Sequence, residues 1–158
     1  MSTPKVRSSE HKKPFIENNN QIDFSKSYCD SSICIAINDS GQIGIDCERI
    51  QIKDESIMRY FFTPNEIQYV ESSAYKDLAF TLIWTRKESF IKCINRGLDF
   101  NIKVLDTAPK CKIQTSEKMF LDNDCIKGFY INSYFIDGLL ISICSSNDDN
   151  FPDFQGGM

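Results

Sequence analysis

The sequence predicts an α+β domain in which an antiparallel sheet packs against one long helix. Apolar segments with a two-residue period occur early in the chain and again near its end, and such segments are typical of strands. Between them, residues 76–95 carry apolar side chains at helical spacing. Strands on both sides of one long helix are expected to pair into a sheet that the helix covers.

The first fifty residues are expected to contain a polar leader and three strands. Residues 1–20 are polar, and residues 22–27 and 31–39 have the pattern of short strands, the second strongly apolar. A turn at residues 40–42 leads into a strand at residues 43–50. Alternation along this strand places one set of side chains on one face (Ile43, Ile45 and Cys47) and the other set on the opposite face (Gly44, Asp46 and Glu48).

Two short helices and one long helix are expected next. Residues 54–62 have the pattern of a short helix, and Thr63, Pro64 and Glu66 form a helix-start signal with a capping box. The long helix runs from about Lys76 to Asn95, and Gly97 is a natural stop. One apolar stripe of this helix is expected to face the sheet; it consists of Phe80, Ile83, Trp84, Ile91 and Ile94, and Lys87 lies near its middle.

The C-terminal part is expected to supply the remaining strands. They are predicted at residues 102–105, 111–115, 128–135 and 139–144, with a hairpin turn at residues 136–138. Residues 146–158 are expected to be a disordered tail. The predicted organisation is therefore a leader at 1–20, one domain at 21–145 and a tail at 146–158.

Composition and charge exclude several classes of function. The chain has 158 residues, of which 41% are hydrophobic, and it has no apolar run that could span a membrane and no signal peptide, so a cytoplasmic location is expected. The net charge of −4 argues against a nucleic-acid-binding surface. The seven cysteines form no C-x-x-C pair and are interpreted as reduced core thiols. The single histidine, His11, argues against a histidine-rich metal site.

The acidic residues of the strand at 43–50 suggest a metal site. Asp46 and Glu48 leave the same face of the strand, so both carboxylates can reach one small cation, and Glu88 on the long helix is a third candidate. A lone D-x-E pair is usually the exposed face of an edge strand, and a lysine–glutamate pair on a helix is usually surface charge. Lys87 within an apolar stripe, however, requires a phosphate or carboxylate partner if it is buried. The combination of these features favours a site.

Three segments together resemble the 4′-phosphopantetheinyl transferases. They are IGIDCERI, RYFFTPNE and WTRKESFIKCINRGL, and they match the family pattern G-[IV]-D-x-E followed by W-x-x-K-E-[AS]-x-x-K and a glycine-leucine stop. Upstream, KKPF resembles the family's G-K-P, and DFSKS resembles its F-[NS]-x-S-H-S. The resemblance covers roughly residues 11–145 and is to the two-lobed, surfactin-synthetase-activating type. It implies a second lobe that is complete and a first lobe that is mostly missing.

The resemblance implies a magnesium-dependent reaction. Coenzyme A would bind with its pyrophosphate on Mg²⁺ held by Asp46, Glu48 and Glu88, and a serine hydroxyl of an apo acyl or peptidyl carrier protein would attack the β-phosphate. Glu88 is the expected base, with Glu66 a poorer candidate, and Lys92 is the expected catalytic cation. The residues expected to bind coenzyme A are Lys13, Lys26, Lys87 and Lys92.

The sequence also departs from the family pattern. Lys26 stands where the family has a histidine, Cys47 replaces an aliphatic residue, and the chain is shorter than the two-lobed enzymes. The short first lobe leads us to expect a homodimer in which each chain covers the other's acidic face and lends Lys13 or Lys26. Two alternatives stay open: a degenerate, non-catalytic homologue that binds carrier protein or coenzyme A, and an unrelated structural α+β domain.

Overall fold

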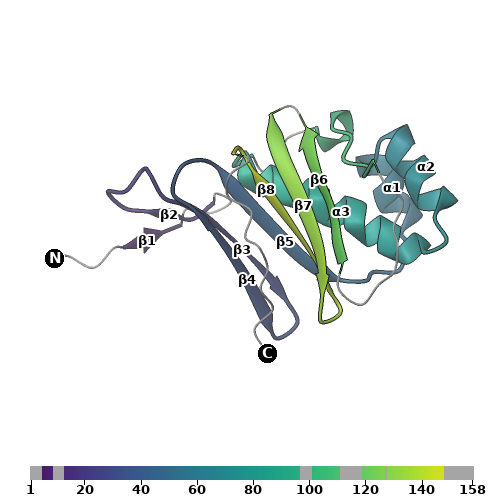
Figure 1. Ribbon diagram of the computed structural model, residues 1–158, viewed down its shortest axis with the longest axis horizontal. Helices are drawn as coiled ribbons and strands as arrows, with labels where there is room; N and C mark the ends of the chain where they lie inside the picture. The colour runs from purple at the N-terminus through teal and green to yellow at the C-terminus, as the bar shows by residue number, and fades with distance from the viewer. Residues whose placement is uncertain (1–4, 9–12, 97–100, 111–118, 127, 148–158) are drawn as a thin grey trace.

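The computed structural model describes residues 5–8, 13–96, 101–110, 119–126 and 128–147. Its centre is an antiparallel four-stranded sheet with the strand order β5-β8-β7-β6, covered on one side by the long helix α3 (Figure 1). The strands are β5 (Ile43–Arg49), β6 (Met119–Ile126), β7 (Phe129–Ile136) and β8 (Leu139–Ser145), and α3 is Lys76–Cys93. The predicted α+β class is confirmed.

A separate hairpin lies beside the free edge of β5. It consists of β3 (Asp23–Cys29) and β4 (Ser32–Asn38), which pair antiparallel, as Figure 1 shows. The hydroxyl oxygens of Ser25 and Ser27 accept hydrogen bonds from the backbone N–H groups of Ile45 and Cys47. The hairpin therefore satisfies the edge of β5 with side chains, and both predicted N-terminal strands are present.

The segment expected to be a polar leader contains regular structure in its described part. Val6–Arg7 (β1) pairs with Phe15–Ile16 (β2), and the backbone N–H of Lys13 donates to Oδ1 of Asn95. These contacts hold the segment near the C-terminal end of α3. Among the described residues, no helix is long and apolar enough to cross a membrane.

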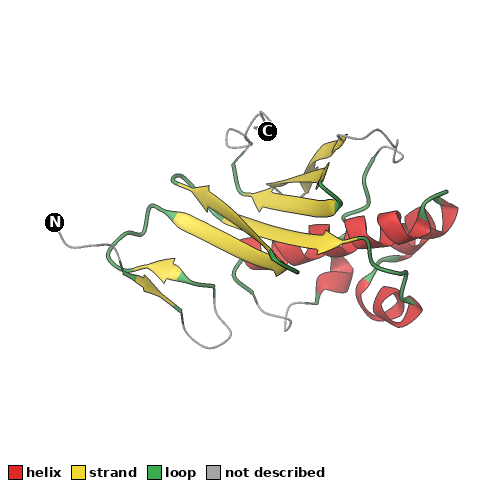
Figure 2. Ribbon diagram, turned by 90° about the horizontal axis from the view of Figure 1, so that it is seen from below, coloured by secondary structure: helices red, strands yellow, loops and turns green. Residues whose placement is uncertain are grey.

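Helix α3 is buried around most of its circumference, which differs from the single stripe that the sequence predicts. Phe80 and Ile83 of the predicted stripe pack against the short helices α1 (Glu55–Phe61) and α2 (Pro64–Ser72) and not against the sheet. On the side of α3 that faces the sheet, Leu82 packs on Leu140 of β8 and Phe90 packs on Ile131 of β7. Between them, the hydroxyl of Thr85 lies 2.8 Å from that of Ser142 on β8. Figure 2 shows α3 between the strands and the short helices. The helix therefore has two packed faces.

Gly44 allows α3 to approach β5 closely. A Cβ atom at this position would lie 2.0 Å from the backbone oxygen of Ser89 and 2.4 Å from the nitrogen of Cys93. No side chain fits in this space. The absence of a side chain at Gly44 thus brings the helix backbone onto the strand two residues before Asp46.

The predicted capping box and the predicted turn are confirmed. Thr63 and Glu66 form the capping box of α2. Asp54, for which no cap was predicted, caps α1. Asp137 and Gly138 join β7 to β8 with φ values of 51° and 77°, which is the backbone of a type I′ hairpin turn.

The predicted strand at residues 102–105 is wrong. Residues Ile102–Val104 form a 3₁₀ turn, in which the backbone N–H of Leu105 donates to the carbonyl oxygen of Ile102. The carbonyl oxygens of Ile102 and Leu105 also accept hydrogen bonds from Lys87. Strand β6 was not predicted. The predicted stop at Gly97, the predicted strand at 111–115 and the tail beyond residue 147 lie outside the described residues.

Candidate functional site

Asp46 is the centre of the candidate site. It lies on β5 beneath α3 and is buried. Its Oδ1 accepts hydrogen bonds from the Ser27 hydroxyl at 2.9 Å and from the Lys92 ammonium at 2.7 Å. Its Oδ2 is buried and has no hydrogen-bond partner among the residues that the structure describes. One half of this carboxylate is thus satisfied and the other half is an unused acceptor, which is costly in a folded protein unless a ligand completes it.

Two further carboxylates lie close enough to interact with Asp46. Glu88 precedes Lys92 by one turn of α3, and Glu48 follows Asp46 by two residues on β5. Burial, and then the negative charge of Asp46, raise the pKa of Glu88 and the pKa of Glu48. Burial also raises the pKa of Asp46, against the opposing effect of Lys92. The three predicted metal ligands therefore belong to one electrostatic cluster.

The cluster suits a hard divalent cation. All its donors are carboxylate oxygens, which Mg²⁺ prefers, and the Oδ2 of Asp46 is a buried oxygen that lacks a partner. Within the described ranges no three His, Cys, Asp or Glu side chains are already gathered as a metal site. The Glu48 and Glu88 side chains would have to rotate to bring the three carboxylates together. As carboxylates, the three side chains are of the ligand type that Mg²⁺ prefers.

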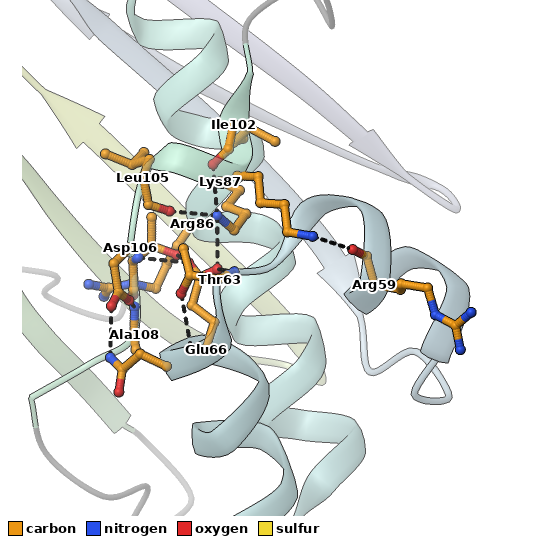
Figure 3. A network of polar contacts seen from close by, with 12 residues as sticks. Arg59, Thr63, Glu66, Arg86, Lys87, Ile102, Leu105, Asp106 and Ala108 are labelled. Carbon is orange, nitrogen blue, oxygen red and sulfur yellow. Dashed lines mark hydrogen bonds and ion pairs between the residues drawn. The ribbon is translucent and has the colours of Figure 1, made fainter.

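Lys87 does not belong to this cluster, which corrects the prediction that it binds phosphate. Its ammonium is fully buried and lies 2.9 Å from Oε2 of Glu66 (Figure 3). It also donates to the carbonyl oxygens of Ile102 and Leu105 at 3.1 and 2.6 Å. All three N–H groups of the ammonium are used inside the fold. The carboxylate partner that a buried lysine requires is present, and it is Glu66.

Glu66 is equally committed to the fold. Its Oε2 accepts the backbone N–H of Thr63 at 2.7 Å, and its Oε1 accepts both the N–H and the hydroxyl of Thr107 (Figure 3). The carboxylate is completely buried. Both oxygens of Glu66 are therefore used within the fold, and neither is directed at solvent or substrate. The structure does not support Glu66 as the base.

The structure places Lys13 and Lys26 in different surroundings. The Lys13 ammonium contacts Asp23 and the carbonyl oxygen of Ile43, one residue before Gly44. Lys26 is exposed on the outer face of β3, and its ammonium lies 5.4 Å from the centre of the Tyr28 ring. Because strand side chains alternate, Lys26 points away from the side on which Ser27 contacts Asp46. The structure therefore does not bring Lys26 to the acidic cluster.

Lys13 borders a cavity of about 670 Å³, lined by both polar and apolar side chains, between the N-terminal segment, the turn after β4 and the C-terminal end of α3. Its lining is rich in amide and hydroxyl groups and includes Asn19, Gln21, Asp23, Ser40, Gln42 and Asn95. The volume is within the range of small-molecule sites. Sequence reasoning missed this cavity, because its walls come from separate segments whose residues carry no common pattern.

Ser27 was also missed as a site residue. Its hydroxyl oxygen accepts the Cys47 N–H at 3.2 Å while the hydroxyl donates to Asp46, so it fixes the carboxylate relative to the strand. The available signal was the alternation Ser25-Lys26-Ser27 on a strand expected to lie near Asp46.

The comparisons with known proteins agree with this geometry. A family model described as the 4′-phosphopantetheinyl transferase superfamily matches residues 42–144, which include Asp46, Glu48, Glu88 and Lys92. The 4′-phosphopantetheinyl transferase gsp of Aneurinibacillus migulanus is 37% identical over 94 residues, which are 58% of this chain and 38% of that protein. The fatty acid synthase subunit alpha of Candida parapsilosis is 29% identical over 101 residues, which are 58% of this chain and 5% of that protein. The chain thus spans less than two fifths of the length of these relatives.

Proposed function

The chain belongs to the 4′-phosphopantetheinyl transferase superfamily, and from this premise we propose that it transfers 4′-phosphopantetheine from coenzyme A to a serine of an apo carrier protein. The proposal includes magnesium as the metal and an acyl or peptidyl carrier protein as the acceptor. The relative named as a phosphopantetheinyl transferase supports the reaction type. The proposed location is the cytoplasm.

The observation that carries the proposal is the buried carboxylate of Asp46. It has one unpartnered oxygen, Lys92 lies 2.7 Å from the other, and Glu48 and Glu88 interact with it electrostatically. A fold gains no stability from an unpaired buried oxygen beside two further carboxylates. A cation that binds this group would offset the cost, and a pyrophosphate could then bind to the cation and to Lys92.

Each residue of the cluster has a distinct role in this proposal. Asp46, Glu48 and Glu88 would hold Mg²⁺, which neutralises charge on the pyrophosphate when it is bound. Ser27 orients Asp46 through its hydrogen bond. Lys92, whose side chain is partly exposed, can reach the phosphate oxygens of a substrate that approaches from solvent. These residues position the β-phosphorus for attack by the serine oxygen.

Glu88 is the proposed acceptor of the serine proton. Burial and then the charge of Asp46 raise the pKa of Glu88 in the metal-free protein. The role as base is proposed because Glu88 is a carboxylate of the acidic cluster, where the serine hydroxyl would have to arrive. The carboxylate of Glu88 would take the hydroxyl proton while the serine oxygen bonds to phosphorus and 3′,5′-adenosine bisphosphate leaves.

The cavity beside Lys13 would accept the nucleotide end of coenzyme A, because its amides and hydroxyls can bind a base and a ribose.

Mass spectrometry of an apo carrier protein tests the reaction directly. The full chain, coenzyme A and Mg²⁺ should add the mass of one phosphopantetheine arm, and Asp46→Asn should remove this activity with little loss of structure. Tyr60→Phe, at an exposed side chain of α1 outside both the acidic cluster and the cavity lining, is a control that should stay active. No transfer at any protein concentration, combined with metal-dependent binding of coenzyme A, would favour the non-catalytic homologue. No transfer and no binding would favour a structural domain.

A further inference from the structure

The outer face of the β3–β4 hairpin is apolar and open to solvent. The inner face, which carries Ser25, Ser27 and Ala36, is buried against the rest of the domain. The outer face carries four large side chains with high exposed fractions: Tyr28 63%, Ile33 53%, Ile35 57% and Ile37 66%. Monomeric proteins rarely leave a contiguous apolar patch of this kind uncovered.

The outer side chains form three cross-strand rows. Phe24 is opposite Ile37, Lys26 is opposite Ile35, and Tyr28 is opposite Ile33. The two end rows each pair an aromatic ring with an isoleucine, and the middle row carries the one charge. Such a face resembles the inner layer of a two-sheet sandwich, in which the second sheet packs about 10 Å away.

We infer that this face binds the same face of a second copy of the chain. A twofold axis parallel to the strands places each β3 over β4 of the other copy. Each row then packs on the same row of the second copy, with the two strands exchanged. Residues of one copy contact residues of the other in this way: Phe24 packs on Ile37, Tyr28 on Ile33 and the stem of Lys26 on Ile35. An axis perpendicular to the strands would instead oppose the two Lys26 ammonium groups, which like-charge repulsion disfavours.

The available area agrees with a weak, specific dimer. At their exposed fractions the four large side chains offer on the order of 100 Å² each. With Lys26 and Phe24 the face offers about 500 Å², so two copies would bury about 1,000 Å² together, near the lower bound for a specific interface. Association is therefore expected at micromolar concentrations.

This inference goes beyond the proposed activity and does not depend on it. Asp46 meets the hairpin through Ser27, which lies on the inner face, so the dimer leaves the acidic cluster uncovered. It also differs from the dimer expected from the sequence, in which each chain covers the acidic face of the other. The catalytic residues of each copy stay within that copy.

Sedimentation equilibrium of the full chain, over about 5 to 500 µM, tests the inference. The wild type should dimerise, and the double variant Ile35→Ser, Ile37→Ser should raise the dissociation constant at least about tenfold. Ile52→Ser is a matched control, because Ile52 is 85% exposed and lies outside the hairpin; it should change the constant by less than about twofold. Circular dichroism and thermal unfolding verify that each variant is folded.

The register has its own test in two glutamate substitutions. Ile35→Glu places a carboxylate opposite Lys26 of the second copy, whereas Ile37→Glu places it on Phe24. Ile35→Glu should therefore weaken the dimer less than Ile37→Glu does. A wild-type monomer at every concentration overturns the inference, and so does a dimer that the two serine substitutions leave unchanged. Equal effects of the two glutamate substitutions overturn the proposed register.

Discussion

The ammonium nitrogen of Lys92 lies 2.7 Å from Oδ1 of Asp46, while Oδ2 of the same carboxylate has no hydrogen-bond partner in the described part of the chain. A lysine of the helix and an aspartate of the strand thus form an ion pair at the edge of the sheet. The lysine side chain is partly exposed to solvent. Lys92 lowers the pKa of Asp46 against the larger raising effect of burial. This ammonium is therefore a positive charge that any cation arriving at Asp46 will encounter.

Replacing Lys92 by methionine should tighten the binding of a divalent cation in the absence of coenzyme A. The substitution removes a positive charge beside the carboxylate ligands, and Mn²⁺ affinity is expected to rise on the order of tenfold. Lys92→Arg keeps the charge and should stay near the wild-type affinity. Electron paramagnetic resonance of free Mn²⁺ gives the constants. Weaker binding by Lys92→Met would mean that Lys92 orients Asp46 for the metal and does not compete with it.

Gly44→Ala should destabilise the domain without touching any charged residue. The added methyl group would meet backbone atoms of α3 at 2.0 and 2.4 Å, so the helix must move away from β5. The free energy of unfolding should fall by about 1–3 kcal/mol or more. Gly41→Ala is the comparison, because its methyl group would meet the movable side chains of Ser146 and Asn147. Urea unfolding measures both, and equal losses would contradict the close-approach argument.

Lys87→Met should lower the free energy of unfolding by about 3–5 kcal/mol, because it leaves Glu66 as a buried charge without its partner. Lys76→Met removes an exposed pair with Glu71 and should cost less than about 1 kcal/mol. At temperatures where Lys87→Met is folded, its affinity for coenzyme A should equal that of the wild type, as calorimetry can measure. Unchanged stability with a large loss of affinity would restore the phosphate-binding role expected from the sequence.

Acid should remove a contribution of Glu71 to stability. Hydrogen bonds from Lys53 and then from Lys76 lower the pKa of Glu71 from 4.5 to about 2. Because the folded state holds this proton less tightly, the contribution is complete above pH 4.5 and is lost as the pH falls toward 2. The melting temperatures of the wild type and Glu71→Gln should therefore converge over this range. Glu55→Gln, at a more exposed carboxylate, serves as the control, and a constant difference between wild type and Glu71→Gln would contradict the assignment.

Local signals in the sequence predicted much of the fold. Thr63, Pro64 and Glu66 act on backbone groups within three residues, so their capping role could be predicted without knowledge of the tertiary structure. The same holds for the turn at Asp137 and Gly138. The orientation of α3 could not be predicted in this way. The predicted stripe was expected to face the sheet, but Phe80 and Ile83 of that stripe pack on α1 and α2. The sheet is contacted instead by other residues of α3, among them Leu82 and Phe90.

In the candidate site, too, roles set by local pattern could be predicted and roles set by tertiary contacts could not. Asp46 and Glu48 share a strand face by alternation alone, and Glu88 was a candidate from its place on the long helix, while the role of Lys92 came from the family pattern. The role of Lys87 depended on contacts with Glu66 and with two carbonyl oxygens in the segment after α3, all distant in sequence. A lysine in an apolar stripe is equally compatible with a substrate cleft and with a buried ion pair. Only tertiary structure distinguishes the two.

The strand order has a consequence for synthesis of the chain. Among the described strands, β5, which carries Asp46, forms a backbone ladder only with β8. Ile43 is paired with Ser145, so its backbone cannot be paired until residue 145 has been synthesised. Such long-range pairing is slow to nucleate, and a ribosome has finished almost all of the described chain before it can begin. The helices α1 and α2, whose contacts are local, can form much earlier. Until β8 emerges, the nascent chain exposes an unpaired apolar strand to chaperones and proteases, and the acidic cluster is among the last parts of the molecule to exist.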